Sequence, residues 1–450
     1  MELTGKRVLV VGLGKSGVAS ALFLKAHGAK VTVSDTKSGD ELRNEIPVLL
    51  DHGITVETGG HGERTFVGQD LIVVSPGVPV DAPKLVQARA LGENVIGEIE
   101  LAAQFLPGPI VAITGSNGKT TTTTLVGEIM TAAGLPALVG GNIGTPAISL
   151  AERATAETVI VLEVSSFQLE TIQKFRPRIA VVLNVTPDHL DRHRTLEAYV
   201  NAKARIFENQ QANDFAVLNA DDPTCVAMAS RTRAQIFWFS RHAEVERGAS
   251  VRDGKILFRD PNGQREILQV SEIPLKGSHN LENVLAAVCA GVLMGCAPEK
   301  IRRAVQDFKA VEHRLEFVAT IGGVDYYNDS KATNVDATIK ALESFPANIH
   351  LILGGKDKGS DYTVLNELLR QRVKRVYTIG AAAAKIESQI KAEVVHAETL
   401  ENAIRKASAA AQSGDVVLLA PACASFDQFK SYEHRGKVFK EVVHTLAQKS

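Results

Sequence analysis

One short turn holds the residue types that nucleotide chemistry needs, within the stretch Ala112-Ile-Thr-Gly-Ser-Asn-Gly-Lys-Thr-Thr-Thr-Thr124. Gly115 and Gly118 let the backbone curl so that successive N–H groups point inward, where they would cradle phosphate oxygens. Lys119 adds a mobile cation, and Thr120 offers a hydroxyl to Mg²⁺. The turn therefore predicts a site for a nucleoside triphosphate.

The segments on either side of this turn have the character of a strand and a helix. We expect a buried strand over Leu106 to Thr114 and a helix over Thr121 to Ala133, which Gly134 closes. The spacing departs from the usual G-x-x-x-x-G-K-S/T pattern, because Ile113 stands where the first glycine is normally found. The predicted phosphate loop is therefore shorter than in most proteins of this kind.

A second glycine-rich turn, Gly12-Leu-Gly-Lys-Ser-Gly17, follows a predicted strand near the start of the chain. The next predicted strand ends at Asp35, at about the offset where a dinucleotide-binding protein holds a ribose hydroxyl, so a nicotinamide-dependent dehydrogenase is one interpretation. Polar groups in and after the turn would serve a uridine or a phosphate equally well: Lys15, Ser16, Thr36 and Lys37. A turn that is kept for packing and binds nothing is the third interpretation.

Carboxylate and imidazole groups follow two further apolar runs. Glu163 ends the run Val159-Ile-Val-Leu-Glu163, and a carboxylate beside the phosphate loop would reach Mg²⁺ bound to Thr120. Capping of the next helix is the alternative role for Glu163. After another apolar run, the loop Asn184 to His193 brings together a dense set of charges and potential ligands: Asp188, His189, Asp191, Arg192 and His193.

Short β-branched runs alternate with helix-length segments in three blocks, and these elements must position the motifs. Besides the strand before the phosphate loop, the expected strands are Arg7 to Val11, Lys30 to Ser34, Asp70 to Ser75, Thr158 to Val164, Ile179 to Asn184, Phe215 to Asn219, Ile349 to Gly354, Arg375 to Gly380 and Asp415 to Ala420. Such alternation predicts parallel sheets wrapped by helices, with ligands at the carboxyl ends of strands.

The chain of 450 residues is too long for one core, and we expect an α/β protein of three domains at 1–98, 99–310 and 311–450. The first and third domains would be Rossmann-like, and the central one a P-loop ATPase-like domain with a mostly parallel sheet.

The composition favours small-molecule ligands. With 50 basic and 51 acidic side chains the net charge is −1, which favours neither nucleic acid nor a membrane surface as a partner. The four cysteines form no C-x-x-C pair, as expected for free thiols in a reducing compartment. The opening residues lack a signal-peptide core, and no run of about 18 apolar residues occurs. We therefore expect a cytoplasmic protein, and a monomer.

Taken together, the motifs resemble those of the Mur ligases, which use ATP to form amide bonds in peptidoglycan synthesis. The resemblance covers essentially the whole chain and rests on these stretches, in family order: Gly12 to Gly17, Ser75-Pro-Gly-Val-Pro79, Thr114 to Thr120, Gly140-Gly-Asn-Ile-Gly144, Asn184 to Arg192, His279-Asn280 with Asn283, His313-Arg314, Asp329-Ser-Lys-Ala-Thr-Asn334 and Ala420-Pro-Ala-Cys-Ala-Ser-Phe-Asp-Gln-Phe429. The resemblance is greatest to the branch of the family that adds D-glutamate to UDP-N-acetylmuramoyl-L-alanine through an acyl phosphate.

The resemblance implies a separate domain for each of three substrates. Domain 1–98 would bind UDP-N-acetylmuramoyl-L-alanine, with Asn142 of the central domain, through Gly14, Lys15, Ser16, Asp35, Thr36, Lys37 and Gly77. Domain 99–310 would bind ATP through Gly115, Ser116, Asn117, Gly118, Lys119, Thr120, Thr121 and Asn280, joined by Arg314, Asp329 and Lys331 of the third domain. Domain 311–450 would bind D-glutamate through Thr333, Lys358, Ser425 and Tyr432, with Lys356 as an alternative to Lys358.

The resemblance further implies two Mg²⁺ sites, one on Thr120 and Glu163 and one on His189, and a catalytic role for Lys119, His189 and Lys203. Lys203 lies in the helical segment Tyr199 to Phe207, and by itself it is an ordinary surface lysine. In the family the matching lysine carries CO₂ as a carbamate, which would supply oxygen ligands to Mg²⁺.

Three other activities fit parts of the chain. A folate-adding ligase would leave the UDP-type first domain without a purpose. A dehydrogenase would leave the Lys119 loop unexplained, and a non-catalytic UDP-sugar-binding protein would leave Glu163 and His189 unexplained.

Overall fold

The computed structural model describes residues 1–62, 64–275, 277–309 and 311–448, and the expected domain boundary at residue 310 lies outside them. The described chain forms two compact units. The first unit comprises Met1–Val185, Glu197–Val270 and Asn283–Gln306, and the second comprises Thr186–Leu196, Ser271–Glu282 and Asp307–Ser450. Among the described residues, no helix is long and apolar enough to cross a membrane.

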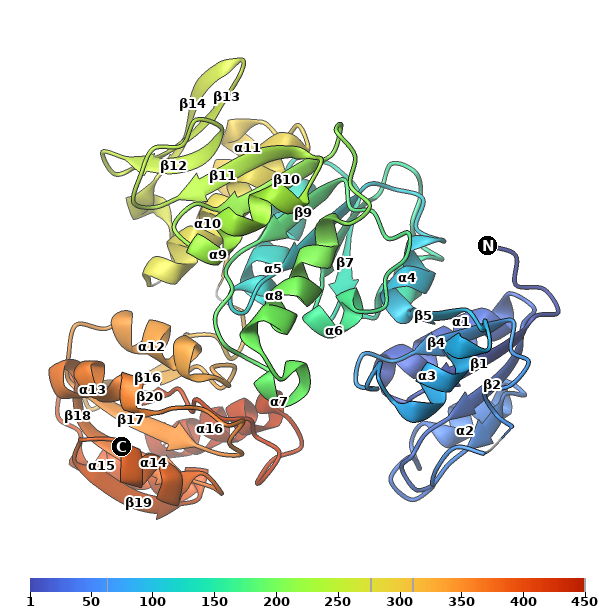
Figure 1. Ribbon diagram of the computed structural model, residues 1–450. Helices are drawn as coiled ribbons and strands as arrows, with labels where there is room; N and C mark the ends of the chain where they lie inside the picture. Colours follow the sequence, from blue (N-terminus) through green and yellow to red (C-terminus); the bar gives the residue numbers. More distant parts are fainter. Residues whose placement is uncertain (63, 276, 310, 449–450) are drawn as a thin grey trace. The chain divides into compact units, whose positions relative to one another are not determined.

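The first sheet has five parallel strands in the order β3-β2-β1-β4-β5. The strands are β1 (Arg7–Val11), β2 (Lys30–Ser34), β3 (Thr55–Glu57), β4 (Leu71–Val74) and β5 (Val95–Gly97), and the helices are α1 (Lys15–Ala26), α2 (Ile46–Asp51), α3 (Pro83–Ala90) and α4 (Glu98–Ala103). The strand order reverses between β1 and β4, which is where doubly wound folds bind ligands. The Rossmann-like fold expected for this region is therefore confirmed (Figure 1).

The central sheet has nine strands in the order β14-β13-β12-β11-β10-β9-β6-β8-β7. The strands are β6 (Ile110–Thr114), β7 (Ala137–Gly141), β8 (Val159–Glu163), β9 (Ile179–Val182), β10 (Phe215–Asn219), β11 (Gln235–Ser240), β12 (Gly248–Arg252), β13 (Lys255–Asp260) and β14 (Gly263–Gln269). The helices in the same stretch of the chain are α5 (Lys119–Ala132), η1 (Ala147–Leu150), α6 (Ser166–Leu169), α7 (Leu190–His193), α8 (Leu196–Ala204), η2 (Arg205–Phe207), α9 (Pro223–Met228), η3 (Ala229–Arg231), η4 (Val270–Glu272), α10 (Ser278–Leu293) and α11 (Pro298–Asp307), of which α7 and the start of α10 belong to the second unit. The seven strands from β12 to β7 in this order, β6 included, pair in parallel with their neighbours. Strands β13 and β14 add antiparallel pairs at one edge.

The third sheet has six strands in the order β15-β16-β20-β17-β18-β19. The strands are β15 (Glu316–Ile321), β16 (Val324–Asn328), β17 (Ile349–Gly354), β18 (Val373–Ile379), β19 (Val394–Glu398) and β20 (Val416–Leu419), and the helices are α12 (Val335–Glu343), η5 (Thr363–Leu365), α13 (Asn366–Arg372), α14 (Ala383–Gln389), α15 (Leu400–Ala410) and α16 (Tyr432–Ala447). All pairs except β15 with β16 are parallel.

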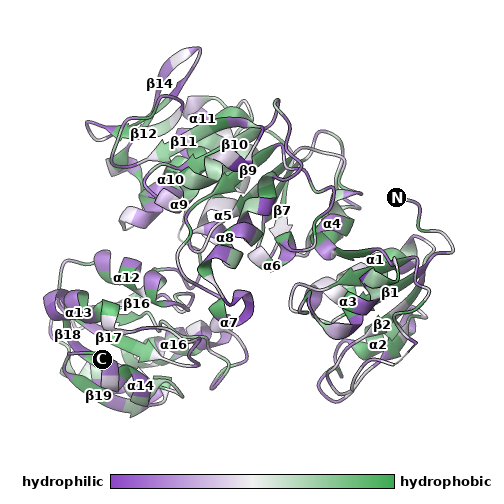
Figure 2. Ribbon diagram, viewed as in Figure 1, coloured by the Kyte–Doolittle hydropathy of each residue, from purple (hydrophilic) through white to green (hydrophobic). Residues whose placement is uncertain are grey.

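The middle strands of these sheets are apolar runs because helices cover both of their faces. Every residue of β6, β8 and β17 is buried. Figure 2 shows the same contrast, with apolar strands inside and more polar helices outside.

Every strand expected from the sequence is present, but two boundaries before and after the phosphate loop were wrong. Strand β6 begins at Ile110 rather than Leu106, since Pro107 and Pro109 lack the N–H that a sheet requires. Helix α5 begins at Lys119, two residues before the expected Thr121. The antiparallel strands of the second and third sheets were not anticipated, because alternation of runs with helices predicts only parallel pairs.

Candidate functional site

The phosphate loop joins the end of β6 at Thr114 to the start of α5 at Lys119, as the sequence predicted. Gly118 has a φ of 83°, and a Cβ placed there would lie 2.1 Å from Asn283 Oδ1, so only glycine fits. Lys119 Nζ donates to the carbonyl oxygens of Gly115 and Ser116, each at 2.8 Å. The ammonium group therefore lies over the loop, where a phosphate would meet it.

Neighbouring side chains fix the shape of this loop. The backbone N–H of Asn117 donates to Asn184 Oδ1 at 2.9 Å, and Asn184 Nδ2 donates to the Asn117 carbonyl at 3.2 Å. The Ser116 hydroxyl lies 3.1 Å from the Tyr199 hydroxyl. Thr121 is buried in the first turn of α5. Asn184 follows β9, which pairs with β6, so the sheet itself sets this arrangement.

Glu163 is buried at the end of β8, which pairs with β6 on the side opposite to β9. Its carboxylate contacts Thr120, directly after the phosphate loop. Thr120 Oγ1 donates to Glu163 Oε2 at 2.7 Å, and Asn142 Nδ2 donates to Glu163 Oε1 at 2.8 Å. Ser165 caps helix α6 through a capping box with Gln168, so the alternative role of Glu163 as the cap is wrong. Thr120 and Glu163 therefore place a hydroxyl and a carboxylate together beside the phosphate loop.

Lys203 is not a surface residue: its side chain is 1% exposed. Its Nζ donates to the Gly115 carbonyl at 2.7 Å and lies 4.5 Å from the centre of the Tyr199 ring. Lys119 Nζ donates to the same carbonyl oxygen. The structure therefore brings two amino groups together on the phosphate loop.

In the first domain, Asp35 stabilises the glycine turn Gly12 to Gly17 through hydrogen bonds to the backbone. Its Oδ2 accepts the Leu13 N–H at 2.7 Å, and its Oδ1 accepts the Lys37 N–H at 2.9 Å. Gly17 allows a close approach of the turn, since a Cβ there would lie 1.9 Å from the Gly12 carbonyl oxygen. The remaining residues expected at this site follow β1, β2 and β4 at the carboxyl edge of the sheet, half-buried at Ser16 and exposed at Gly14, Lys15, Thr36, Lys37 and Gly77.

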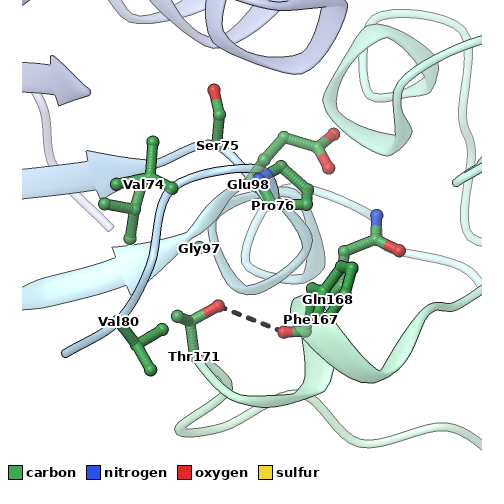
Figure 3. A pocket seen from close by; sticks show the side chains of 10 residues that line it. Val74, Ser75, Pro76, Val80, Gly97, Glu98, Phe167, Gln168 and Thr171 are labelled. Atoms are coloured by element: carbon green, nitrogen blue, oxygen red, sulfur yellow. Dashed lines mark hydrogen bonds between the residues drawn. The ribbon is translucent and has the colours of Figure 1, made fainter. Parts of the chain in front are cut away.

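A small pocket at the ends of β4 and β5 contains a buried acid that the sequence analysis missed (Figure 3). Glu98 Oε1 accepts the Ile148 N–H at 2.8 Å, whereas Glu98 Oε2 has no hydrogen-bond partner among the described residues. Burial raises the pKa of Glu98 to about 7, against the opposing effect of the N–H groups of Ile148 and Ala147. Glu98 is therefore largely protonated in slightly acidic solution.

The third domain collects its expected residues at one edge of its sheet. Asp329, Lys331 and Thr333 follow β16, Ser425 follows β20, and Lys358 follows β17. These three strands are neighbours, and their carboxyl ends lie together because they are parallel. Ser425 is buried and Thr333 is half-buried, whereas Lys356, the alternative to Lys358, is exposed.

Two polar contacts organise this edge. Lys331 Nζ donates to the Tyr432 hydroxyl at 2.8 Å and lies 4.1 Å from the centre of the Tyr432 ring. Burial raises the pKa of Asp329 to about 7, against the opposing charge of Arg314 and the N–H of Leu315. Asp329 and Arg314, both expected near ATP, therefore lie close enough to interact.

The loop that carries His189 belongs to the second unit. Asp188 accepts a hydrogen bond from Asn334 Nδ2 at 3.0 Å and lies 3.5 Å from Lys358 Nζ, while His189 Nε2 lies 3.6 Å from Asp188 Oδ2. The expected cluster is only partly formed, because Asp191 is exposed and His193 is buried. Asn280 is buried in the first turn of α10 and also belongs to the second unit, whereas Lys203, Thr120 and Glu163 belong to the first.

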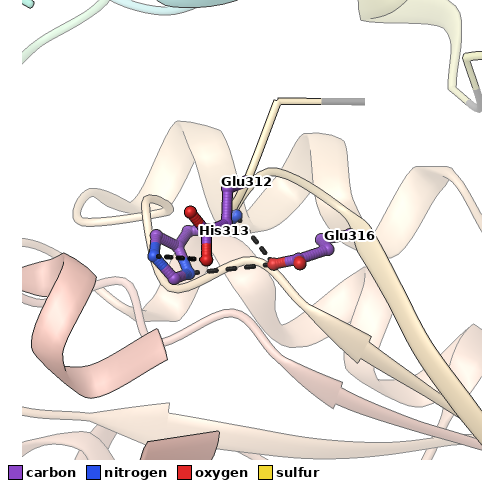
Figure 4. A group of neighbouring side chains, drawn as sticks. All are labelled: Glu312, His313 and Glu316. Atoms are coloured by element: carbon purple, nitrogen blue, oxygen red, sulfur yellow. Dashed lines mark hydrogen bonds and ion pairs between the residues drawn. The ribbon is translucent and has the colours of Figure 1, made fainter. Parts of the chain in front are cut away.

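An acidic cluster with one histidine, which the sequence did not predict, is formed by Glu312, His313 and Glu316 (Figure 4). His313 is buried, and desolvation lowers its pKa. Lys440 Nζ donates to both carboxylates, at 3.0 Å for Glu316. The lysine ammonium already supplies the cation here, so the cluster is an ion-pair network.

The three regions match three family models: the Mur ligase MurD-like N-terminal domain over residues 6–97, the Mur ligase middle domain over 113–291, and the Mur ligase glutamate ligase domain over 313–423. A UDP-N-acetylmuramoylalanine–D-glutamate ligase of Koribacter versatilis is 69% identical over 449 residues, which cover 100% of this chain and 99% of the relative. The chain belongs to the Mur ligase family. A relative with the same name from Acidobacterium capsulatum is 60% identical over 98% of this chain and 97% of its own.

Solved structures of Mur ligases agree in fold. A UDP-N-acetylmuramate-alanine ligase from Thermotoga maritima aligns with a TM-score of 0.61 at 19% identity, over 98% of this chain and 99% of its own. A pseudomurein peptide ligase type C from Methanothermus fervidus aligns with a TM-score of 0.62 at 20% identity, over 98% of this chain and 100% of its own. These alignments confirm the α/β fold with three domains and mostly parallel sheets.

Proposed function

We propose that this chain is the ATP-dependent ligase that joins D-glutamate to UDP-N-acetylmuramoyl-L-alanine in peptidoglycan precursor synthesis. The observation that carries the proposal is the phosphate loop with Lys119 and the Thr120–Glu163 pair, in a chain 69% identical over its whole length to a D-glutamate ligase of that substrate. A dehydrogenase would have no use for this loop, and both oxygens of Asp35, its expected ribose ligand, accept backbone N–H groups.

The reaction needs positive charge and hydrogen-bond donors at the phosphates, and the phosphate loop provides both. A carboxylate is a poor acyl donor, so the alanine carboxylate first attacks the γ-phosphate of ATP, which forms an acyl phosphate and releases ADP. The amine of D-glutamate then displaces phosphate and forms the amide. Two anions must meet in the first step, and the Lys119 ammonium and the loop N–H groups offset their repulsion. Removal of such a group typically costs a few kcal/mol of barrier.

The donor set beside the loop suits Mg²⁺. The Thr120 hydroxyl and the Glu163 carboxylate are 2.7 Å apart, and hard oxygen ligands are those that Mg²⁺ prefers. A bound Mg²⁺ would neutralise charge on the phosphates. Asn142, which holds the second oxygen of Glu163, would couple the metal site to the sugar-peptide substrate.

We propose that Lys203, in the first unit, carries CO₂ as a carbamate that would supply oxygen ligands to a second Mg²⁺. An ammonium group would repel a metal ion, whereas a carbamate is an anion with two oxygen ligands. The position of Lys203 supports this assignment, because its side chain is buried and its Nζ lies 2.7 Å from the Gly115 carbonyl of the phosphate loop.

The remaining assignments follow the domains, which we place at 1–98, 99–310 and 311–450. The first would bind the UDP substrate, the second ATP, and the third D-glutamate through Thr333, Lys358, Ser425 and Tyr432. We propose a cytoplasmic location, since ATP and UDP-linked precursors are cytoplasmic metabolites and the four cysteines are free. That the enzyme is a monomer stays a prediction.

Phosphate release from ATP tests the proposal. The full mixture of ATP, Mg²⁺, UDP-N-acetylmuramoyl-L-alanine and D-glutamate should release phosphate continuously, and omission of either co-substrate should stop turnover. Mass spectrometry should find the UDP product heavier by one glutamyl residue. Release that needs a folate in place of the UDP substrate, or no release in the full mixture, would contradict the proposal.

A further inference from the structure

Arg435 is a fully buried arginine in the first turn of α16, with a relative exposure of 0%. Its Nε donates to the Ser330 hydroxyl at 2.9 Å, and its Nη2 donates to the Ser330 carbonyl at 2.8 Å. Its Nη1 and Nη2 donate to the Cys423 carbonyl at 3.1 and 3.2 Å, and Nη1 also reaches the Ala424 carbonyl at 3.4 Å. One guanidinium therefore joins two separate loops.

The partners of Arg435 are all neutral. Within the part of the chain that the structure describes, no carboxylate lies within ion-pair distance of this guanidinium. Buried arginines are normally paired with acids, because an uncompensated buried charge is unfavourable. Burial lowers the pKa of Arg435 to about 10, against the opposing charge of the more distant Asp427, so the group stays protonated at neutral pH. An apolar side chain would avoid the desolvation penalty of the charge, but it would leave the carbonyl oxygens of Ser330, Cys423 and Ala424 without this donor.

The loops that Arg435 joins are those to which the amino acid substrate is assigned. Ser330 lies next to Lys331 and precedes Thr333, and Ala424 precedes Ser425. A third loop packs against the same guanidinium: a Cβ placed on Gly355 would lie 3.2 Å from Nη1, and this loop leads to Lys358. The three loops follow the neighbouring strands β16, β20 and β17.

We propose that Arg435 is the positioning residue of the amino acid site: it fixes the spacing of these three loops and places a buried positive charge beneath a site for a dicarboxylic amino acid. The inference rests on the proposed function. It adds that the acidic amino acid is favoured by a charge that it does not touch, as well as by the residues that contact it.

The test compares steady-state kinetics of the wild-type chain and Arg435→Met for each substrate in turn. Methionine is long and apolar, so it fills much of the space while removing the charge and all five hydrogen bonds. We expect kcat/KM for D-glutamate to fall by about 100-fold, the loss typical of a misplacement of about 1 Å. The KM for the UDP substrate should stay unchanged, because that substrate is assigned to the first domain.

Arg372 provides a matched control in the same domain. Its Nη1 also donates to three backbone carbonyls, those of Leu342, Glu343 and Phe345, but at the amino edge of the sheet. Arg372→Met should therefore lower the melting temperature and leave kcat/KM for D-glutamate at the wild-type value. If both variants change D-glutamate kinetics equally, the role of Arg435 is only structural and the inference is overturned.

Arg435→Lys covers the case in which the methionine variant does not fold. Lysine keeps the charge but cannot span all three carbonyls, so kcat/KM for D-glutamate should fall between the values of the wild type and Arg435→Met. A wild-type value in either folded variant would overturn the inference.

Hydrogen exchange separates this inference from the proposed function. In folded Arg435→Met or Arg435→Lys, amides of 330–333 and 424–425 should exchange faster than in the wild type, whatever reaction the enzyme performs. A wild-type chain that does not use D-glutamate would refute the proposed function. Unchanged exchange in these loops would refute the positioning role.

Discussion

Glu98 offers a prediction whose size follows from the structure. Burial raises its pKa from 4.5 to about 7, so the charged form is disfavoured in the folded chain. The wild type therefore loses stability, relative to a variant without this charge, as the pH rises from 4.5 to 7. Glu98→Gln removes the ionisation and keeps an oxygen that can accept the Ile148 N–H. The full effect amounts to roughly 3 kcal/mol.

The free energy of unfolding should be measured for both proteins by denaturant titration between pH 5 and pH 8. Integration of the two titration curves gives a stabilisation by Glu98→Gln of about 1 kcal/mol at pH 5, which rises to about 3 kcal/mol at pH 8. The sign is unusual, because most core substitutions destabilise. A difference that stays constant or falls over this range would show that Glu98 is not held neutral by burial.

Glu100 is the control, since it is equally buried on the same helix. Its carboxylate accepts the N–H groups of Gln173, Lys174 and Phe175 at 2.8 to 3.0 Å. The amide of a glutamine would turn an NH₂ group toward these donors. Glu100→Gln should therefore destabilise the protein at pH 8, by about 1.5 to 3 kcal/mol. Stabilisation by both substitutions would mean that the effect at Glu98 is not specific to its unpartnered oxygen.

Three predictions concern the reaction. Lys119→Ala should remain folded and lose ATP-dependent ligation, because a cation beside the transferred phosphoryl group is removed; near-normal turnover would contradict its role, and Lys255→Ala, at an exposed lysine of the same sheet, is the control. Asp35→Ala should raise the KM for the UDP substrate and leave the KM for ATP unchanged, because the two hydrogen bonds of Asp35 shape the glycine turn. If calorimetry shows tight NADH binding that is lost in Asp35→Ala, the dehydrogenase interpretation is supported instead. Lys203→Ala should be nearly inactive and partly restored by acetate, whereas Lys203→Arg should not be restored; full activity of Lys203→Ala without acetate would exclude the carbamate.

The sequence predicted those parts of the site that depend on local order along the chain. The phosphate loop, the glycine turn of the first domain and Glu163 each follow a buried strand, and the apolar runs that mark these strands are easy to recognise. The strand order could not be derived in the same way, since it depends on pairing between distant segments. Thus the Thr120–Glu163 contact was expected only in outline, and the Asn142–Glu163 contact was not expected.

Other features of the site leave no signal in a single sequence. Arg435 lies in a helix with many charged neighbours, where a solvated face is the ordinary expectation, and Glu98 begins a short helix that carries a second acid, Glu100. Their burial results from packing against segments more than 45 residues away, such as Ile148 for Glu98 and Ser330 for Arg435. Lys203 likewise had the pattern of a surface residue, and only the fold placed it against Gly115.

Transfer of an oxygen isotope from the alanine carboxylate to phosphate tests the acyl-phosphate mechanism. UDP-N-acetylmuramoyl-L-alanine labelled with ¹⁸O in both oxygens of its alanine carboxylate should be turned over with ATP and D-glutamate, and the released phosphate analysed by mass spectrometry. Attack of the carboxylate on the γ-phosphate places one labelled oxygen between carbon and phosphorus, and the amine then expels it with the phosphate. We expect one ¹⁸O atom in each phosphate released. Unlabelled phosphate, formed together with the glutamyl product, would contradict this mechanism.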